Sequence, residues 1–470
     1  MNIKHSEITI DPENPFENCK LDRKKYSQVL TGLINSYSEG FVLAINNKWG
    51  TGKTTFIKMW KQDLINNGYK TVYFNAWEND FENNPLVAIM GELKILTKKS
   101  ADPEFKSILK KASILSKHLV PIVAQSIVDR YIDTKEIKDA IVDLSKGASD
   151  LFENDVNEYS AKKKGIKEFR TGLSHFIANN NDGKPLIFII DELDRCRPNY
   201  AVSILEQIKH FFSIPDIIFV LSIDKEQLGN AICGVYGSDK IDSNEYLRRF
   251  IDIEYSIPEP ENNVFHKYLY SYFGFDDFLE KNSRKQYREL ASDKRSFLEI
   301  SNILFSNNSI TLRQQEKIFS HSRLAMRSFG DNMYLVPEIF LFLIYTKVIN
   351  ENYYNKIKSK TLSIPELQEE FYKIIKNKIN EDTQRLLMWL EAYLVLFYTN
   401  YIHQDYRRNK IFERDATLNK NKLLVHSIIN KSADDEFLSV FENIDNSRNS
   451  GNLDISHFTN RIDLTESIIN

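Results

Sequence analysis

One short segment constrains the fold of this chain more than any other. Residues 41–45 are continuously apolar, and the sequence NKWGTGKTT follows at residues 47–55 with two glycines. Beyond it, apolar residues recur at helical spacing as far as Ile65. A buried strand, a glycine-containing loop and a helix, in this order, form the setting of a phosphate-binding loop. The segment therefore predicts an α/β fold built on a parallel sheet.

The loop departs from the usual phosphate-loop pattern at its first position. That pattern is Gly-x-x-x-x-Gly-Lys-Ser/Thr, and Asn47 stands here where the first glycine is expected. Asn tolerates a left-handed backbone better than other non-glycine residues, so we expect Asn47 to adopt it. Lys53 would reach the β- and γ-phosphates of ATP, and the Thr54 hydroxyl would bind Mg²⁺. The predicted nucleotide-binding residues of this loop are Asn47, Lys48, Trp49, Gly50, Thr51, Gly52, Lys53, Thr54 and Thr55.

A pair of acidic residues follows a second apolar run, at residues 186–190. An apolar strand that ends in an acid is typical of a magnesium-binding strand end, so we expect Asp191 to hold the metal, directly or through water. Glu192 comes next and is the candidate catalytic base, which would polarise the attacking water. Acids at a helix start can also cap it, and Asp194 could do so before Pro198. Loop and acids together predict an ATPase site.

Polar residues also end a third apolar run, at residues 217–221. In ATPases with an additional central strand, a polar residue at this strand end lies between the acids and the γ-phosphate. We assign Ser222 or Asp224 such a sensor role. Capping of the next helix by Asp224 explains the pattern equally well.

The alternation of apolar runs and helical patterns predicts the domain organisation. Strands are expected at residues 41–45, 71–74, 186–190, 217–221 and 251–257, with helices on both faces of the sheet. About 110 residues separate the second and third strands, far more than a compact connection needs, which indicates a helical insertion. We therefore predict a core made of residues 1–95 and 166–260, an insertion at 96–165, a helical lid at 261–350 and an all-α C-terminal domain at 351–470.

Several motifs together resemble those of the KAP family of P-loop NTPases. WGTGKT at residues 49–54 is similar to that family's loop, and FNAW at 74–77 to its Phe-Asn-x-Trp. DELDRCRP at 191–198 is close to its Asp-Asp-Leu-Asp-Arg-Cys-x-Pro, with Glu192 in place of the second Asp. Shorter similarities are Tyr246-Leu247, Ile257-Pro258 and Thr311-Leu312-Arg313.

The resemblance implies an AAA-like core with strand order 5-1-4-3-2 and an insertion between the two motifs. In many members the insertion holds transmembrane helices. No apolar run here reaches the roughly 18 residues of a membrane span, so we expect none. Bacterial members are associated with exclusion of bacteriophage.

The resemblance also suggests roles for arginines. Arg249 follows Arg248 just before the fifth strand, where related ring ATPases place an arginine that reaches a neighbour's γ-phosphate. Arg313 resembles the helical-subdomain arginine, and Arg195 is a third candidate. We include Arg249 and Arg313, with Lys53 and Glu192, among the candidate catalytic residues. A solvated, basic helix end is the alternative interpretation of residues 248–249.

Composition excludes other classes of protein. Lys+Arg number 62 against 65 Asp+Glu, a formal net charge of -3, which excludes a protein that coats nucleic acid through bulk charge. Three scattered cysteines offer no disulfide framework or metal-ligand spacing, and with an N-terminus unlike a secretion signal they favour a cytoplasmic location. Arg170 and His175 have the spacing of a ribonuclease helix motif, which we interpret as coincidence.

The sequence thus predicts an ATP-hydrolysing molecular switch that uses Mg²⁺. We expect a homo-oligomer whose C-terminal helices signal to a protein effector, with antiviral defence as the setting. One alternative is a nucleotide-stabilised scaffold with little hydrolysis, for which Asn47 in the loop is the sequence support. The other, weaker alternative is a DNA-stimulated ATPase. The basic residues 407–410 could form a nucleic-acid patch, although we prefer to interpret them as a solvated helix face.

Overall fold

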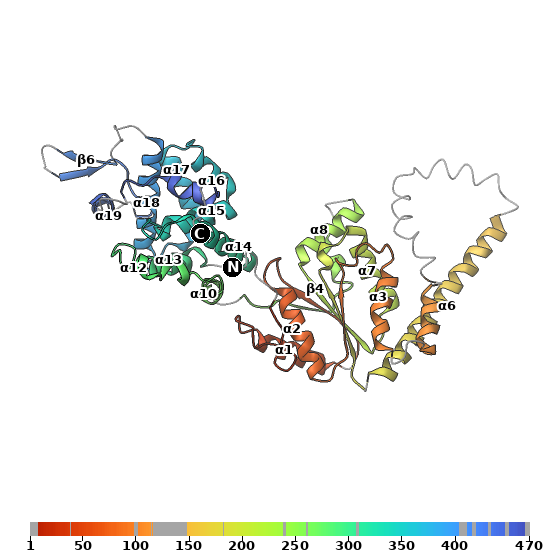
Figure 1. Cartoon of the computed structure of the whole chain (residues 1–470). Coiled ribbons are helices and arrows are strands. Elements are labelled where there is room, and N and C mark those ends of the chain that lie inside the picture. Colours follow the sequence, from red (N-terminus) through yellow and green to blue (C-terminus); the bar gives the residue numbers. More distant parts are fainter. Residues whose placement is uncertain are drawn as a thin grey trace. The chain divides into compact units, whose positions relative to one another are not determined.

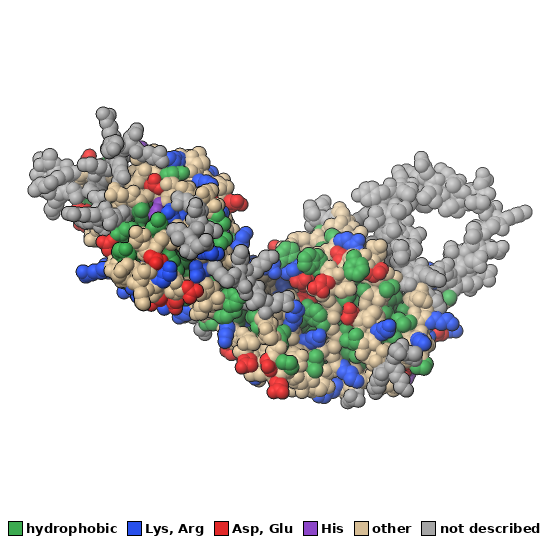
Figure 2. Space-filling view, viewed as in Figure 1, with side chains coloured by type: hydrophobic (Ala, Val, Ile, Leu, Met, Phe, Trp, Pro, Cys, Tyr) green, Lys and Arg blue, Asp and Glu red, His purple; other side chains and the backbone are tan. Residues whose placement is uncertain are grey.

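The computed structural model describes most of the chain as two compact units. The described residues are 8–37, 39–97, 102–113, 115, 148–181, 183–237, 241–259, 262–306, 310–403, 411–415, 420–430, 434–446 and 451–465. We call Ile8–Pro258 the N-terminal unit and Glu259–Asn470 the C-terminal unit. Among the described residues, no helix is both long and apolar enough to cross a membrane. Side chains of both charge signs are interspersed over the visible surface of each unit (Figure 2).

A five-stranded parallel sheet forms the centre of the N-terminal unit (Figure 1). Its strands are β1 (Val42–Asn46), β2 (Thr71–Asn75), β3 (Leu186–Asp191), β4 (Ile217–Ile223) and β5 (Ile253–Tyr255). Their order is β2-β3-β4-β1-β5, which confirms the predicted order 5-1-4-3-2. Only β5 differs clearly from its expected bounds, because this short edge strand pairs with β1 alone and has no buried residue.

Helices cover both faces of this sheet (Figure 1). On one face lie α1 (Lys24–Ser36) and α2 (Lys53–Asn66), and on the other lie α3 (Pro85–Leu93), α6 (Ala148–Asn180), α7 (Pro198–Phe211) and α8 (Lys225–Tyr236). Alternate residues of β3 serve the two cores, since Ile187 packs with α1 and α2 while Phe188 packs with α6 and α7. Burial on both faces explains why β3 and β4 are apolar along their length.

The predicted insertion is only partly described. Phe105 and Ile108 belong to a short helical stretch that packs in the same core as Phe169 of α6. Residues 116–147 of the insertion lie outside the described residues. Shorter elements complete the N-terminal unit: η1 (Lys94–Leu96), η2 (Leu193–Arg195) and α9 (Ser243–Leu247).

The C-terminal unit is built mainly from helices around α15 (Pro337–Ile349), in which every residue from Ile339 to Thr346 is buried. Pro337 occupies the first turn of that helix, where its missing N–H costs nothing. The core joins helices on both sides of residue 350, so the predicted boundary there stays a prediction. The other elements are α10 (Asn262–Tyr272), α11 (Asp276–Leu279), α12 (Asn282–Lys285), α13 (Asp293–Leu304), α14 (Leu312–Ala325), η3 (Met326–Ser328), α16 (Glu351–Lys358), α17 (Ile364–Ile375), η4 (Lys376–Lys378), α18 (Gln384–Ile402), α19 (Asp434–Asn446) and α20 (Ile455–Ile462).

A two-stranded hairpin corrects the expectation of an all-α C-terminal domain. Strands β6 (Phe412–Asp415) and β7 (Lys420–Leu423) pair in antiparallel register, with Glu413 opposite Lys422. Both strands are polar over most of their length, so they lack the apolar alternation by which a strand is recognised in sequence. The basic residues 407–410 lie outside the described residues.

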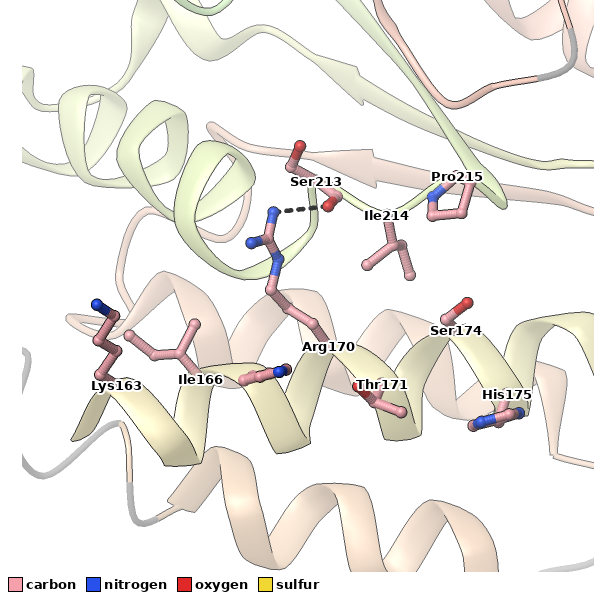
Figure 3. A pocket seen from close by; sticks show the side chains of 10 residues that line it. Lys163, Ile166, Arg170, Thr171, Ser174, His175, Ser213, Ile214 and Pro215 are labelled. Atoms are coloured by element: carbon pink, nitrogen blue, oxygen red, sulfur yellow. Dashed lines mark hydrogen bonds between the residues drawn. The ribbon is translucent and has the colours of Figure 1, made fainter. Parts of the chain in front are cut away.

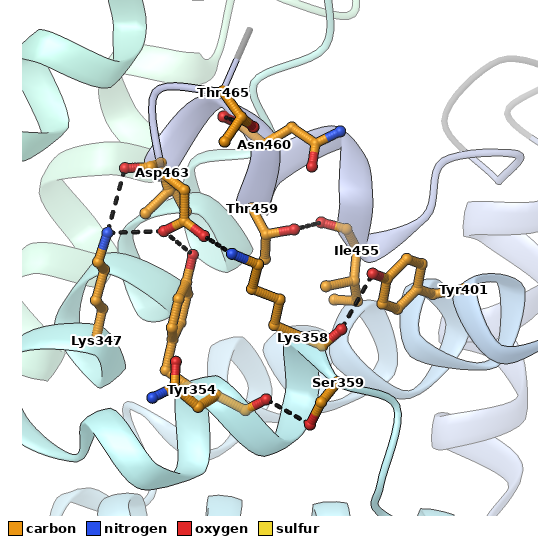
Figure 4. Close-up of polar contacts among 12 residues, drawn as sticks. Lys347, Tyr354, Lys358, Ser359, Tyr401, Ile455, Thr459, Asn460, Asp463 and Thr465 are labelled. Atoms are coloured by element: carbon orange, nitrogen blue, oxygen red, sulfur yellow. Dashed lines mark hydrogen bonds and ion pairs between the residues drawn. The ribbon is translucent and has the colours of Figure 1, made fainter.

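One carboxylate attaches helix α20 to the rest of the C-terminal unit (Figure 4). Asp463, directly after α20, accepts hydrogen bonds from Lys347 Nζ at 2.7 Å, Lys358 Nζ at 2.5 Å and Tyr354 Oη at 3.0 Å. Burial by itself would raise the pKa of Asp463, but these donors outweigh burial and the pKa lies below its usual value. Because folding favours the ionised form, this carboxylate stabilises the fold at neutral pH.

Asp463→Asn is expected to lower the free energy of unfolding by about 2 kcal/mol at neutral pH, because two ammonium groups lose their charged acceptor. The loss should shrink as pH falls through the low pKa of Asp463, where the wild-type carboxylate is protonated too. Urea unfolding of the full chain at neutral and acidic pH measures both effects. Glu381→Gln, at an exposed position of the same unit, is the matched control. A loss of stability in Asp463→Asn that does not change with pH would contradict this role of the Asp463 carboxylate.

Candidate nucleotide-binding site

The phosphate loop lies between the carboxyl end of β1 and the start of α2. Gly50 and Gly52 have φ angles of 77° and 80°, a left-handed conformation that glycine adopts without steric cost. Gly52 is the residue before α2, so the turn delivers the chain directly into the helix. The first N–H groups of a helix have no partner within it and favour anions, which suits this end of α2 to a phosphate.

Asn47 differs from its sequence-based expectation. It is absent from the positive-φ residues of the described chain, so it does not imitate a left-handed glycine. Its amide instead pairs with the backbone of Ile257: Nδ2 donates to the Ile257 carbonyl at 2.8 Å, and Oδ1 accepts from the Ile257 N–H at 2.9 Å. Asn47 can form both bonds because its carboxamide carries a donor and an acceptor side by side, which match the C=O and the N–H of a single backbone residue. Asn47 thereby ties the loop to the segment that follows β5.

Lys53 is the first residue of α2 and is buried. Its ammonium donates to the carbonyl of Asn47 and lies 3.4 Å from that of Lys48, so it folds over its own loop. Burial lowers the pKa of Lys53, and the nearby Asp194 carboxylate acts in the opposite sense. The lysine is therefore a cation held inside the loop, at the place where a phosphate chain would pair with it.

The carboxyl ends of β3 and β4 bring Asp191 and Ser222 side by side, since these two residues are paired in the sheet. Asp191 is 1% exposed, and its two oxygens accept from the Glu192 N–H at 2.9 Å and from Tyr73 Oη at 3.0 Å. The Ser222 hydroxyl is fully buried and has no hydrogen-bond partner among the described residues. This edge of the sheet thus holds oxygen ligands with unused capacity.

Glu192 has an unusual backbone and two side-chain partners. Its φ angle is 60°, a left-handed value that costs a non-glycine residue free energy and that often marks functional sites. Its carboxylate lies 2.8 Å from Arg195 Nη1 and accepts from Asn75 Nδ2 at 3.4 Å. Burial raises the pKa of Glu192, and Arg195 opposes that shift. Arg195 and Asn75 therefore fix the position of the Glu192 carboxylate, and burial makes it more basic than the carboxylate of an exposed glutamate.

Trp49 joins the phosphate loop to Asp194, which follows β3, and to Asp224, which follows β4. Its indole N–H donates to Asp194, and its backbone N–H donates to Asp224 Oδ2 at 3.1 Å. The other Asp224 oxygen accepts from the Gln227 N–H at 3.3 Å and caps α8, so both sequence-based interpretations of Asp224 are compatible with its contacts. Asp194 does not cap α7, whose N-cap is Arg197. Burial raises the pKa of Asp194.

The three arginine candidates differ in where they lie. Arg249 is exposed and lines a small pocket with Gly40 and Val42, at the amino ends of the strands, whereas the loop lies at their carboxyl ends. Arg313 is exposed in the first turn of α14, in the C-terminal unit. Arg195, the third candidate, contacts a residue of the site in its own unit, because it pairs with Glu192.

Comparison with known protein families decides the relationship. The KAP family P-loop domain matches residues 23–333 of this chain. The chain belongs to the KAP family of P-loop NTPases. The family match, the strand order and the loop together make this chain a nucleotide-binding P-loop protein.

Other similarities are weaker. An uncharacterized protein of Methanocaldococcus jannaschii is 42% identical over 67 residues, which cover 14% of this KAP NTPase and 34% of that protein. The chain thus spans about a third of the length of this curated relative. The Aeropyrum pernix ORC2 protein, solved in ADPNP–ADP complexes, aligns with 90% of this chain and 94% of its own, at 13% identity and a TM-score of 0.31. A DNA replication initiation factor aligns with 84% of this chain and 100% of its own, at 13% identity and a TM-score of 0.28. These structural similarities are too low to bear on function.

Sequence reasoning missed contacts that hold the KAP loop in place. Arg23, 4% exposed, donates to the carbonyls of Thr51 at 2.8 Å and Gly52 at 3.2 Å. A single arginine 28 residues before its partner has no recognisable spacing, so only the fold could reveal it. Arg197 fixes the segment after β2, because its N–H and Nε both lie 2.7 Å from the Asp80 carboxylate.

Asn47→Gly distinguishes the two interpretations of the first loop position. It restores the usual glycine but removes both hydrogen bonds to Ile257, so we expect it to lower the free energy of unfolding by about 2 kcal/mol. Urea unfolding measures the change, followed by tryptophan fluorescence in a chain that carries Trp389→Phe, so that the signal comes from this unit and its buried Trp60. Asn14→Gly, at an exposed turn position, is the control for glycine's added backbone entropy. An unchanged or increased stability of Asn47→Gly would contradict the clamp.

Proposed function

We propose that this KAP NTPase hydrolyses ATP at the edge of the sheet where its loop meets the strand-end acids. One observation carries the proposal: Trp49, inside the loop, donates to both Asp194 and Asp224, which joins the phosphate loop to the acidic strand ends in one site. Ligands of open α/β sheets bind outside the carboxyl ends of the strands, where these residues lie.

The loop would bind the phosphates of ATP. Lys53 would exchange the carbonyls of Asn47 and Lys48 for the β- and γ-phosphates, a stronger, charge-assisted pairing. The remaining loop residues would contribute N–H groups to the same anion. Ser222 and Asp224 are the proposed sensors, next to Asp191 and Trp49 respectively.

A magnesium ion fits the donors at this edge. Thr54 and Asp191 would hold it, with hard oxygen ligands of the kind that Mg²⁺ prefers. The remaining ligands of such an ion would be phosphate oxygens of the nucleotide and water. When bound, the ion would neutralise charge that develops on the phosphates.

Glu192 is the proposed general base. Burial raises its pKa, which makes the carboxylate a better proton acceptor at neutral pH. Arg195 and Asn75 fix its position, and the pairing with Arg195 must loosen for the carboxylate to take a proton from water. Arg195 in turn lies 5.6 Å from the centre of the Trp77 ring, an alternative contact for its cation.

Two substitutions separate binding from hydrolysis. Lys53→Ala should lose ATP binding, because the loop loses the buried cation that would pair with the β- and γ-phosphates. Glu192→Gln should bind ATP with unchanged affinity but hydrolyse it at least about 100-fold more slowly, since the amide cannot accept the proton. Calorimetry and phosphate release measure the two effects. Glu226→Gln, exposed on α8, is the matched control. Wild-type turnover by Glu192→Gln would contradict the assigned base.

We further propose that the active form is a homo-oligomer in which Arg249 acts on the nucleotide of a neighbour. Arg249 is exposed and lies at the sheet edge opposite to the loop of its own chain, so a second copy must supply its phosphate. Trp77 and Phe81, which follow β2, are 52% and 81% exposed. Large apolar side chains this exposed favour burial against another subunit.

Mixing two inactive variants tests the role of Arg249. Arg249→Ala should reduce turnover by roughly 1,000-fold, the scale on which an arginine finger acts. Mixed with Glu192→Gln, it should regain activity, because an intact site would receive Arg249 from the neighbouring chain. Arg248→Ala, one residue away and paired with Glu245, is the control. If mixtures show only the sum of the separate rates, Arg249 does not act between chains.

The biological setting follows from the family resemblance. We propose that ATP turnover switches the C-terminal unit between states that a protein effector distinguishes, in defence of a bacterium against phage. Phage plating on cells that express wild type, Lys53→Ala or Glu192→Gln tests this, with protection expected from wild type alone. Protection by Lys53→Ala would show that defence does not depend on ATP binding. The alternative, a nucleotide-stabilised scaffold with little hydrolysis, predicts equal protection by wild type and Glu192→Gln.

A further inference from the structure

A second pocket lies in the N-terminal unit between α6 and the Ser213–Pro215 segment that precedes β4 (Figure 3). Its volume is about 620 Å³, within the range of pockets that hold small ligands. The segment before β4 belongs to the amino edge of the sheet, while the phosphate loop and the strand-end acids belong to the carboxyl edge. The pocket is therefore separate from the proposed ATPase site.

Cationic side chains line one end of this pocket. Lys163, Lys167 and Arg170 follow one another at three- and four-residue intervals, which places them on one face of α6. Arg170 donates to the Ser213 carbonyl at 2.6 Å and is thereby fixed, while its guanidinium retains further N–H donors. Lys163 and Lys167 form no ion pair among the described residues, whereas Lys164, beside them, pairs with Glu168. This end is suited to an anion.

The remainder of the lining has a different character. Ile214 and Pro215 provide an apolar surface on the segment that faces α6, while Ile166 lies beside Lys163 on α6, as Figure 3 shows. Thr171 and His175 follow further along α6 and bring hydroxyl and imidazole groups, which can both donate and accept hydrogen bonds, whereas the Ser174 hydroxyl already donates to Asp216 Oδ2 at 2.7 Å. The cations at one end match a phosphate. The apolar surface and the mixed polar groups match a flat, hydrogen-bonding ring joined to that phosphate.

The positive field extends beyond the pocket. Burial lowers the pKa of His210, and the charges of Lys209 and Arg170 lower it further. Both cations therefore lie close to the carboxyl end of α7, next to the Ser213–Pro215 segment. The carboxylates of Glu168 and Asp216 lie nearby, but the cations outnumber them, and such a local excess of positive charge favours an anionic ligand.

We propose that this pocket binds a nucleotide-class ligand, with its phosphate at Lys163, Lys167 and Arg170 and its base against Ile214 and Pro215. A free nucleotide and a nucleotide within a single-stranded nucleic acid present the same chemistry. Binding of either ligand in this pocket requires no hydrolysis at the phosphate loop, so it is independent of the ATPase activity. The pocket gives the chain a second place at which nucleotide or nucleic acid could regulate it.

Binding is tested in the full chain carrying Lys53→Ala, which removes the phosphate-loop site. The probes are radiolabelled ATP and GTP by equilibrium dialysis, and a fluorescent single-stranded oligothymidylate by anisotropy at low salt. At least one probe should bind, and adding Lys163→Glu with Lys167→Glu should weaken it at least roughly tenfold. Binding of mononucleotide alone identifies a free nucleotide as the ligand, and binding of oligonucleotide alone identifies a nucleic-acid strand.

The control carries the same charge change elsewhere. Lys106→Glu with Lys110→Glu reverses two exposed lysines of the same unit and should leave binding unchanged. In the chain with Lys53 intact, the pocket should appear as a second binding event that needs no magnesium, which keeps the test valid if Lys53→Ala folds poorly. The proposal is overturned if no probe binds at this second site, or if the two double variants bind equally.

Discussion

The parallel pairing of β1, β3 and β4 is the constraint on which the rest of the N-terminal unit depends. Backbone hydrogen bonds set Asp191 beside Ser222 and Asn46 beside Ile223, so that all three strands end at one edge. Each strand is apolar up to that edge and polar just past it. The hydrophobic effect therefore buries the strands, and the same register gathers their polar ends into one site.

Side-chain contacts then hold the phosphate loop from several directions. Asn47 fastens it to the segment after β5, Trp49 to Asp194 and Asp224, and Arg23 supports its carbonyls from the start of α1. Each contact joins residues distant in sequence, so the loop keeps its shape only while the whole unit is folded. Such preorganisation is what a phosphate site requires, because donors already in place need not reorganise when the anion arrives.

Sequence reasoning predicted those features that depend on local pattern. The five strands follow from apolar periodicity, whereas their order is what the resemblance to the KAP family implies. Asn47 was misinterpreted because its identity suits both a left-handed turn and a backbone clamp, and only the position of Ile257 decides between them. Arg23 carried no signal, since its partners are brought near by the fold. The hairpin β6–β7 was missed because its polar strands lack an apolar face.

Single-turnover phosphate release shows whether the site hydrolyses ATP with an arginine from a neighbouring chain. Trace radiolabelled ATP is mixed with an excess of the full chain and Mg²⁺, over a range of chain concentrations. Our account predicts that bound ATP is hydrolysed and that the rate rises with chain concentration, as each site gains an arginine from a neighbour. ATP that stays bound and intact at every chain concentration would contradict it.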